Sequence, residues 1–153
     1  MSSSIIKGTA GDVTVTDKIR MNLGRPIIKG ALAFPLMNRA VLTSGATVTY
    51  TAAQVLGGMI IDTITANCAA TLPTPASIVA GVPGAIVGTS FEIDILNTAA
   101  SAIVITVTAN GASTVVGTAT INQANNKRIR AVITNVGLGT EAVVFYMLGS
   151  SST

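Results

Sequence analysis

Residues 88–107 read GTSFEIDILNTAASAIVITV, and this stretch decides the fold class. Its first half alternates apolar with acidic residues, setting Phe91, Ile93 and Ile95 against Glu92 and Asp94. Alternation with a period of two predicts a strand that turns one face to a core and the other to water. A small polar segment follows, and apolar residues then alternate again at Ile103, Ile105 and Val107. The stretch therefore predicts two strands joined as a hairpin.

The composition of the whole chain agrees with a β fold. Hydrophobic residues make up 49% of the 153 residues, but aromatic residues only 3% and charged residues 10%. Ala, Val and Ile are interleaved with Thr, Ser and Gly, which suits pleated, half-buried strands better than helices. Turn signals recur at intervals of about 8 to 12 residues, as in β-sandwiches. We therefore predict an all-β, jelly-roll-like β-sandwich.

Two very short helices are expected between the strands. Thr51 and Gln54 have the spacing of a capping box, which predicts a helix over residues 52–56. Thr74 followed by Pro75 predicts a second helical turn that ends at Gly81. Cys68 is the single cysteine, and the chain contains no histidine to activate it, so we interpret it as a small buried residue.

The first 40 residues differ from the rest of the chain. They contain six basic and two acidic residues, a net charge of +4, whereas the remainder has three basic and four acidic residues, a net charge of −1. Frequent Gly and Pro interrupt short apolar pieces in this segment, which predicts an extended arm laid across another surface. We thus divide the chain into an N-terminal arm (1–40), a β-sandwich domain (41–148) and a loose C-terminal tail (149–153).

A second charge pattern lies within the predicted sandwich. Glu92 and Asp94 alternate outward on one strand, and Arg128 and Arg130 do so on another. If these strands are neighbours, the four side chains form a cross-strand charge ladder. The alternative is four separately solvated charges. Exposed ion pairs add little stability, so the main effect of a ladder would be on strand register.

The order of several segments resembles a known domain. These segments are TYTAAQVLGG (49–58), TLPTPASIVAGVPG (71–84), VGTSFEIDILN (87–97), VVGTATI (115–121) and TNVGLGTEAVVFY (134–146). Together they resemble a small β-sandwich domain of virion surface proteins in tailed bacteriophages and some large DNA viruses. Such domains occur in head-decoration (cement) proteins, head fibres and receptor-facing tips. The resemblance covers residues 41–148 and includes no catalytic motif.

The resemblance implies a homotrimer on the capsid surface of a virion, made in the host cytoplasm. It implies a structural protein whose N-terminal segment binds the major capsid protein and which stabilises or covers the shell. A chain with so little charge is also expected to hide apolar surface against other copies of itself. The arm cations expected to contact the capsid are Lys18, Arg20, Arg25, Lys29 and Arg39.

Other classes of function have weaker support in the sequence. An enzyme needs a positioned base, an activated nucleophile or a metal, and the nearest approach is the carboxylate pair Glu92 and Asp94. We therefore expect no catalytic site, no metal and no cofactor. The arm lacks a dense basic cluster with aromatic residues, which argues against nucleic acid. The chain has no run of about 18 apolar residues, which argues against a membrane span.

An adhesin or head-fibre tip that binds a host glycan or protein remains the alternative function. Sugar sites use exposed aromatic rings, and the domain offers only Tyr50, Phe91, Phe145 and Tyr146. We expect Phe91 and at least one of Phe145 and Tyr146 to lie in the core. The sequence thus leaves few rings for a glycan.

Overall fold

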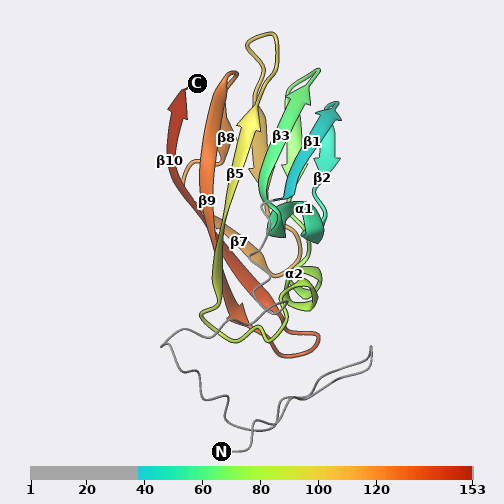
Figure 1. Ribbon diagram of the computed structural model, residues 1–153, viewed down its shortest axis with the longest axis vertical. Coiled ribbons are helices and arrows are strands. Elements are labelled where there is room, and N and C mark those ends of the chain that lie inside the picture. The colour runs from blue at the N-terminus through green and yellow to red at the C-terminus, as the bar shows by residue number, and fades with distance from the viewer. Residues whose placement is uncertain (1–37, 153) are drawn as a thin grey trace, which may run out of the picture. The chain divides into compact units, whose positions relative to one another are not determined.

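The alternating strands form two sheets that face each other, as the computed structural model shows for residues 38–152 (Figure 1). The six-stranded sheet has the order β1-β3-β5-β9-β10-β7 and the four-stranded sheet has the order β2-β4-β6-β8. The strands of the larger sheet are β1 (Asn38–Ser44), β3 (Gly58–Ile64), β5 (Ser90–Asn97), β7 (Ser113–Val116), β9 (Asn125–Asn135) and β10 (Ala142–Ser152). Those of the smaller sheet are β2 (Thr47–Thr49), β4 (Cys68–Thr71), β6 (Ile105–Thr108) and β8 (Thr120–Ile121). The predicted all-β sandwich is therefore confirmed.

The chain passes from one sheet to the other three times in succession. Each of the pairs β1–β2, β3–β4 and β5–β6 begins in the six-stranded sheet and ends in the four-stranded sheet. Successive pairs stack in parallel, so β1, β3 and β5 run in one direction, as do β2, β4 and β6. Five of the eight pairings among the described strands are parallel. A jelly roll consists of antiparallel strands, so the term fits the two facing sheets but not this strand order.

The predicted hairpin over residues 88–107 is wrong, because its two strands lie in different sheets. β5 pairs with β3 and β9, whereas β6 pairs with β4 and β8. The connection is held by the buried amide of Asn97, whose Nδ2 donates to the carbonyls of Ile103 (2.9 Å) and Ile121 (3.2 Å). Its Oδ1 accepts from the backbone N–H of Ala99 at 3.1 Å. The apolar face of β5 and the apolar face of β6 therefore pack into the same core from opposite sheets.

Two short helices connect the crossing pairs, as predicted. Helix α1 (Ala52–Leu56) has the full capping box, in which Gln54 N–H donates to Thr51 Oγ1 and Thr51 N–H donates to Gln54 Oε1. Helix α2 (Pro75–Gly81) begins with Pro75 after its cap Thr74, whose hydroxyl accepts from the N–H of Ser77. Local capping therefore fixes both helix starts.

The boundaries of the domain differ from those predicted. β1 begins at Asn38, so the last three residues assigned to the arm belong to the sandwich. The C-terminal residues predicted to be loose instead continue β10 as far as Ser152, beyond a register shift between Met147 and Ser150. The unusually long β9 supplies their partners, and Ser152 pairs with Asn125. Residues 1–37 lie outside the described part of the chain.

The core fills the space between the sheets. Its large members are aliphatic residues of both sheets, of the two helices and of the connection at Leu72, together with Tyr50 and Phe145. Phe91 is half-buried and packs against this core, while Tyr146 is 40% exposed. Cys68 is buried and forms no disulfide, which confirms its interpretation as a small buried residue.

Candidate interaction surfaces

A charge ladder crosses the outer face of the six-stranded sheet. β5 and β9 are antiparallel neighbours, with Glu92 opposite Arg130 and Asp94 opposite Arg128. Arg128 donates through Nε and Nη2 to the two carboxylate oxygens of Asp94, each at 3.0 Å. Arg130 donates through Nε (3.2 Å) and Nη2 (2.6 Å) to Oε1 of Glu92. These are the pairs that the sequence predicts.

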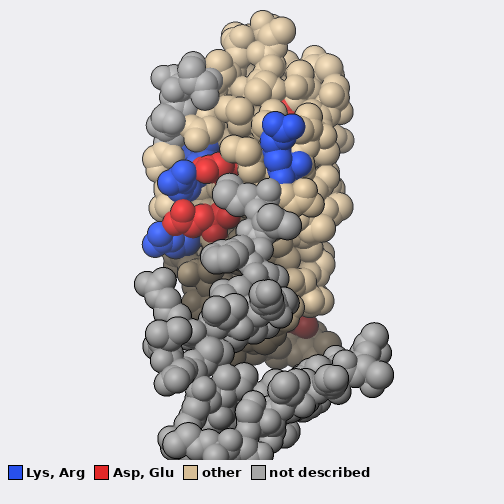
Figure 2. All heavy atoms as spheres, in the orientation of Figure 1, with Lys and Arg blue, Asp and Glu red and all other residues tan. Residues whose placement is uncertain are grey.

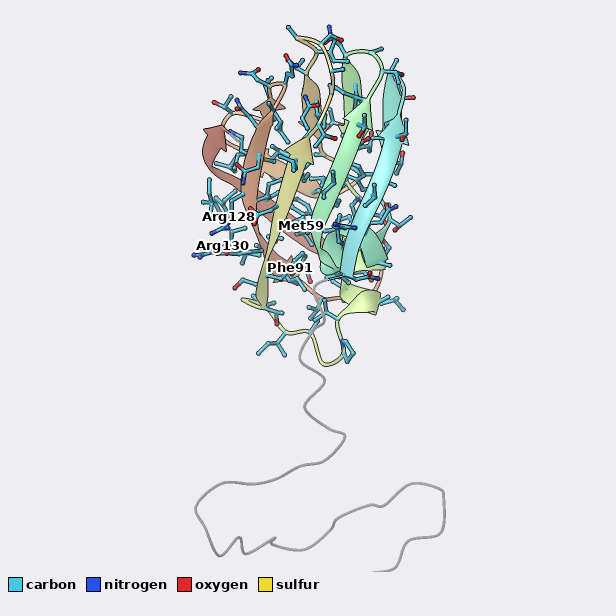
Figure 3. All side chains as sticks on the ribbon, turned by 45° about the horizontal axis from the view of Figure 1, so that its top comes forward. Met59, Phe91, Arg128 and Arg130 are labelled. Atoms are coloured by element: carbon cyan, nitrogen blue, oxygen red, sulfur yellow. The ribbon has the colours of Figure 1, made fainter. Side chains whose placement is uncertain are left out.

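The ladder forms a local cluster of opposite charges over β5 and β9 (Figure 2). Figure 3 shows Arg128 and Arg130 extending from the same side of β9. Hydrogen bonding to Asp94 raises the pKa of Arg128, and the charges of Asp94 and Glu92 act in the same direction. Each carboxylate of the pair is thus matched by an arginine.

Arg39 is the one predicted capsid-contacting cation that the described residues include. It lies in β1 rather than in the arm, and its side chain is exposed. Arg39 is in register with Met59, which is in turn in register with Asp94, so it shares the outer face with the ladder. Lys18, Arg20, Arg25 and Lys29 lie outside the described residues.

An apolar row runs beside the ladder on the same face. Val41, Ile61 and Leu96 are in register on β1, β3 and β5, and Val41 is 60% exposed. Val41 lies on an edge strand of the sheet, where a further strand or side chain has access.

The outer face of the four-stranded sheet is uncharged. Its outward residues form two cross-strand rows: Thr47, Ala69, Thr106 and Thr120 in one, and Thr49, Thr71 and Thr108 in the other. In the second row the hydroxyl of Thr108 donates to Thr71 Oγ1 at 3.2 Å. Within the four strands no residue carries a charge. Methyl and hydroxyl groups therefore make up both rows.

A buried polar cluster lies inside the sandwich. The Asp62 side chain is fully buried, and its Oδ2 accepts hydrogen bonds from Ser44 Oγ (2.9 Å) and Tyr50 OH (3.2 Å). Its Oδ1 has no hydrogen-bond partner. Burial, followed by the charge of Asp62, raises the pKa of the Tyr50 phenol and of the Cys68 thiol. The cluster thus favours the protonated forms of both neighbours.

Sequence reasoning did not single out Asp62, and it named Tyr50 only as an aromatic ring available to a glycan. The sequence did contain a signal for the burial of Asp62, because this residue alternates with Ile60 and Ile64 and therefore shares their inward face. Among the described residues, no group of three or more His, Cys, Asp or Glu side chains is placed to hold a metal ion. No helix in this part of the chain is long and apolar enough to cross a membrane.

Comparison with protein-family models, with curated proteins and with solved structures found no match to this chain.

Proposed function

We propose that the chain is a non-enzymatic structural protein of a virion, a homotrimeric decoration or cement protein on the capsid surface. In this proposal the N-terminal arm binds the major capsid protein, and the sandwich stabilises or covers the shell. The observation that carries it is the uncharged outer face of the four-stranded sheet. The cores of protein interfaces are depleted in charged residues, whereas the surface of a free monomer is not.

Self-association buries this face without a desolvation cost for charged groups. In a trimer, three copies of this threonine and alanine face turn toward a common threefold axis, and its hydroxyl groups bond to each other or across the contacts. The charged residues of the opposite sheet face remain in water, which keeps the assembly soluble. The resemblance of residues 41–148 to virion surface domains supports the trimer and the location.

The alternative function is a head-fibre or receptor-binding tip. Of the aromatic residues available to stack on a glycan, Tyr50 and Phe145 are fully buried and Phe91 packs against the core. Tyr146 remains, 40% exposed and in register with Arg130. One ring beside an arginine is a small basis for glycan recognition, so decoration is the better supported function.

Binding to empty shells of the parent virus, assembled without this protein, tests the arm. We expect the full chain to co-sediment with these shells and a variant lacking residues 1–37 to remain in the supernatant. This deletion spares every residue of β1, and circular dichroism of the variant checks that its strands are retained. Decoration of the shells by the truncated variant would contradict the assignment of capsid binding to the arm.

A further inference from the structure

We propose that one end of the sandwich, formed by residues 82–89 and 136–141, seats on the capsid surface that the arm binds. We call these two loops the base loops. This inference rests on the proposed function and adds to it a second, apolar contact with the major capsid protein. The occupant is an uncharged, apolar part of that protein's outer surface.

The base loops expose large apolar side chains. Ile86 is 68% exposed, Val87 62% and Leu138 98%. Two of these side chains come from the α2–β5 connection and the third from the β9–β10 connection. Glu141 is the single charged residue in the two loops. An end of the domain that exposes three large apolar side chains beside a single charged residue has the composition of a protein–protein contact surface.

Backbone hydrogen bonds join the first base loop to the end of β9, just before the second loop begins. The N–H of Gly88 donates to the carbonyl of Ile133 at 2.8 Å, and the N–H of Ile133 donates to the carbonyl of Thr89 at 2.9 Å. In Figure 1 both connections lie at the same end of the sandwich, below α2. Three exposed apolar side chains thus share one end of the domain.

Each loop is a defined turn. In the first, Ile86 N–H donates to Thr89 Oγ1 at 3.1 Å and Thr89 N–H donates to the Ile86 carbonyl at 3.0 Å. In the second, Thr140 N–H donates to the Gly137 carbonyl at 2.8 Å, and Gly139 has a φ of +77°, which favours glycine. Because the turns satisfy their own backbone groups, the apolar side chains are presented outward at little further entropic cost on binding.

The direction of the strands places the start of β1 toward the base loops. β1 is parallel to β3 and β5, so the chain enters β1 from the end of the sheet that carries the base loops. Asn38, the first residue of β1, therefore lies toward this end, and the 37 residues that precede it in the sequence could span at most about 130 Å if fully stretched. A surface bound by the arm lies within easy reach of the base. Cations of the arm then supply charge contacts, and the base supplies apolar burial.

The test uses the full chain with the substitutions Ile86→Ser, Val87→Ser and Leu138→Ser. The matched control replaces three exposed apolar residues elsewhere, Val116→Ser, Tyr146→Ser and Leu148→Ser. We measure the affinity of each variant for the empty shells and its molar mass in solution. The base variant is expected to bind at least about tenfold more weakly than the unsubstituted chain, with an unchanged mass, because it loses buried apolar area. The control is expected to bind like the unsubstituted chain.

Three outcomes overturn the inference, and they separate it from the proposed function. If the base variant binds shells normally while removal of residues 1–37 abolishes binding, the base contact is wrong and the decoration function stands. If the base variant has a lower molar mass, the base joins copies of this chain and does not contact the shell. If the unsubstituted chain itself does not bind shells, the decoration function fails and the base contact fails with it.

Discussion

Removing both hydroxyl donors to Asp62, through Ser44→Ala and Tyr50→Phe together, is expected to lower the free energy of unfolding by about 2–5 kcal/mol. Asp62 is fully buried, and the structure gives its carboxylate these two side-chain partners, both on Oδ2. Without them the carboxyl group is buried with no side-chain donor, which costs far more than an exposed group losing the same bonds. Chemical denaturation at a fixed protein concentration measures the loss.

A third substitution distinguishes this explanation from simple loss of packing. Adding Asp62→Leu to the double variant removes the buried polar group, so the triple variant is expected to be more stable than the double variant. Tyr146→Phe is the matched control, because it removes the same hydroxyl from an exposed ring and is expected to change stability by less than about 0.5 kcal/mol. A triple variant less stable than the double variant would contradict the account.

Alkaline pH provides a further readout of the same cluster. The pKa of Tyr50 is raised in the folded protein, chiefly by burial and then by Asp62. In the unfolded chain the phenol ionises near pH 10, so the unfolded state releases a proton that the folded state retains. The contribution of Tyr50 to stability is therefore complete below about pH 10 and declines above it. Tyr50→Phe is expected to remove this part of the decline.

Phe145→Ala is expected to destabilise the domain by about 3–5 kcal/mol. The ring is fully buried in the core, on the inward face of β10. β10 pairs with both β9 and β7, so the surrounding strands are held in place and cannot close the cavity that the substitution leaves. Denaturant unfolding of the two proteins at equal concentration measures the difference.

The neighbouring residue provides the control for Phe145. Tyr146 lies on the opposite face of the same strand and is 40% exposed, so Tyr146→Ala is expected to cost much less than Phe145→Ala. Similar losses for the two variants would show that the alternation of faces along β10 is wrong.

The sequence predicted those features of the fold that depend on local patterns. Alternation of apolar and acidic residues gave the inward face of β5, and the Thr51 and Gln54 pair gave the start of α1. The ladder of Glu92, Asp94, Arg128 and Arg130 also followed from alternation, once β5 and β9 are neighbours. Local patterns gave the faces of the strands and the helix start, whereas the ladder also needed the pairing of β5 with β9, which the sequence does not show.

The features that failed depend on contacts distant in sequence. Two alternating strands separated by a short polar segment predict a hairpin, but the pattern does not distinguish a turn within one sheet from a crossing between two sheets. The side chain of Asn97 supports the crossing through a bond to Ile121, 24 residues away. The strand at Gly149–Ser152 likewise exists because β9 is long enough to pair with it, and its Gly and Ser composition gave no signal.

The candidate surfaces were predictable in part. The sequence contained the low charge of the chain and the outward carboxylates and arginines. The uncharged face of the four-stranded sheet could not be recognised, because its threonines come from four short strands whose register is set only by the fold. The base loops likewise become one surface only when β5, β9 and β10 are side by side.

The central claim is that the chain works as a trimer, and its molar mass in solution tests this most directly. Light scattering behind size exclusion, in moderate salt, measures the mass of the full chain independently of its shape. We predict a mass near 46 kDa, three times the 15.4 kDa of one chain. A mass of 15.4 kDa, that of a single chain, would contradict the claim, because the uncharged sheet face would then be stable in water without a partner.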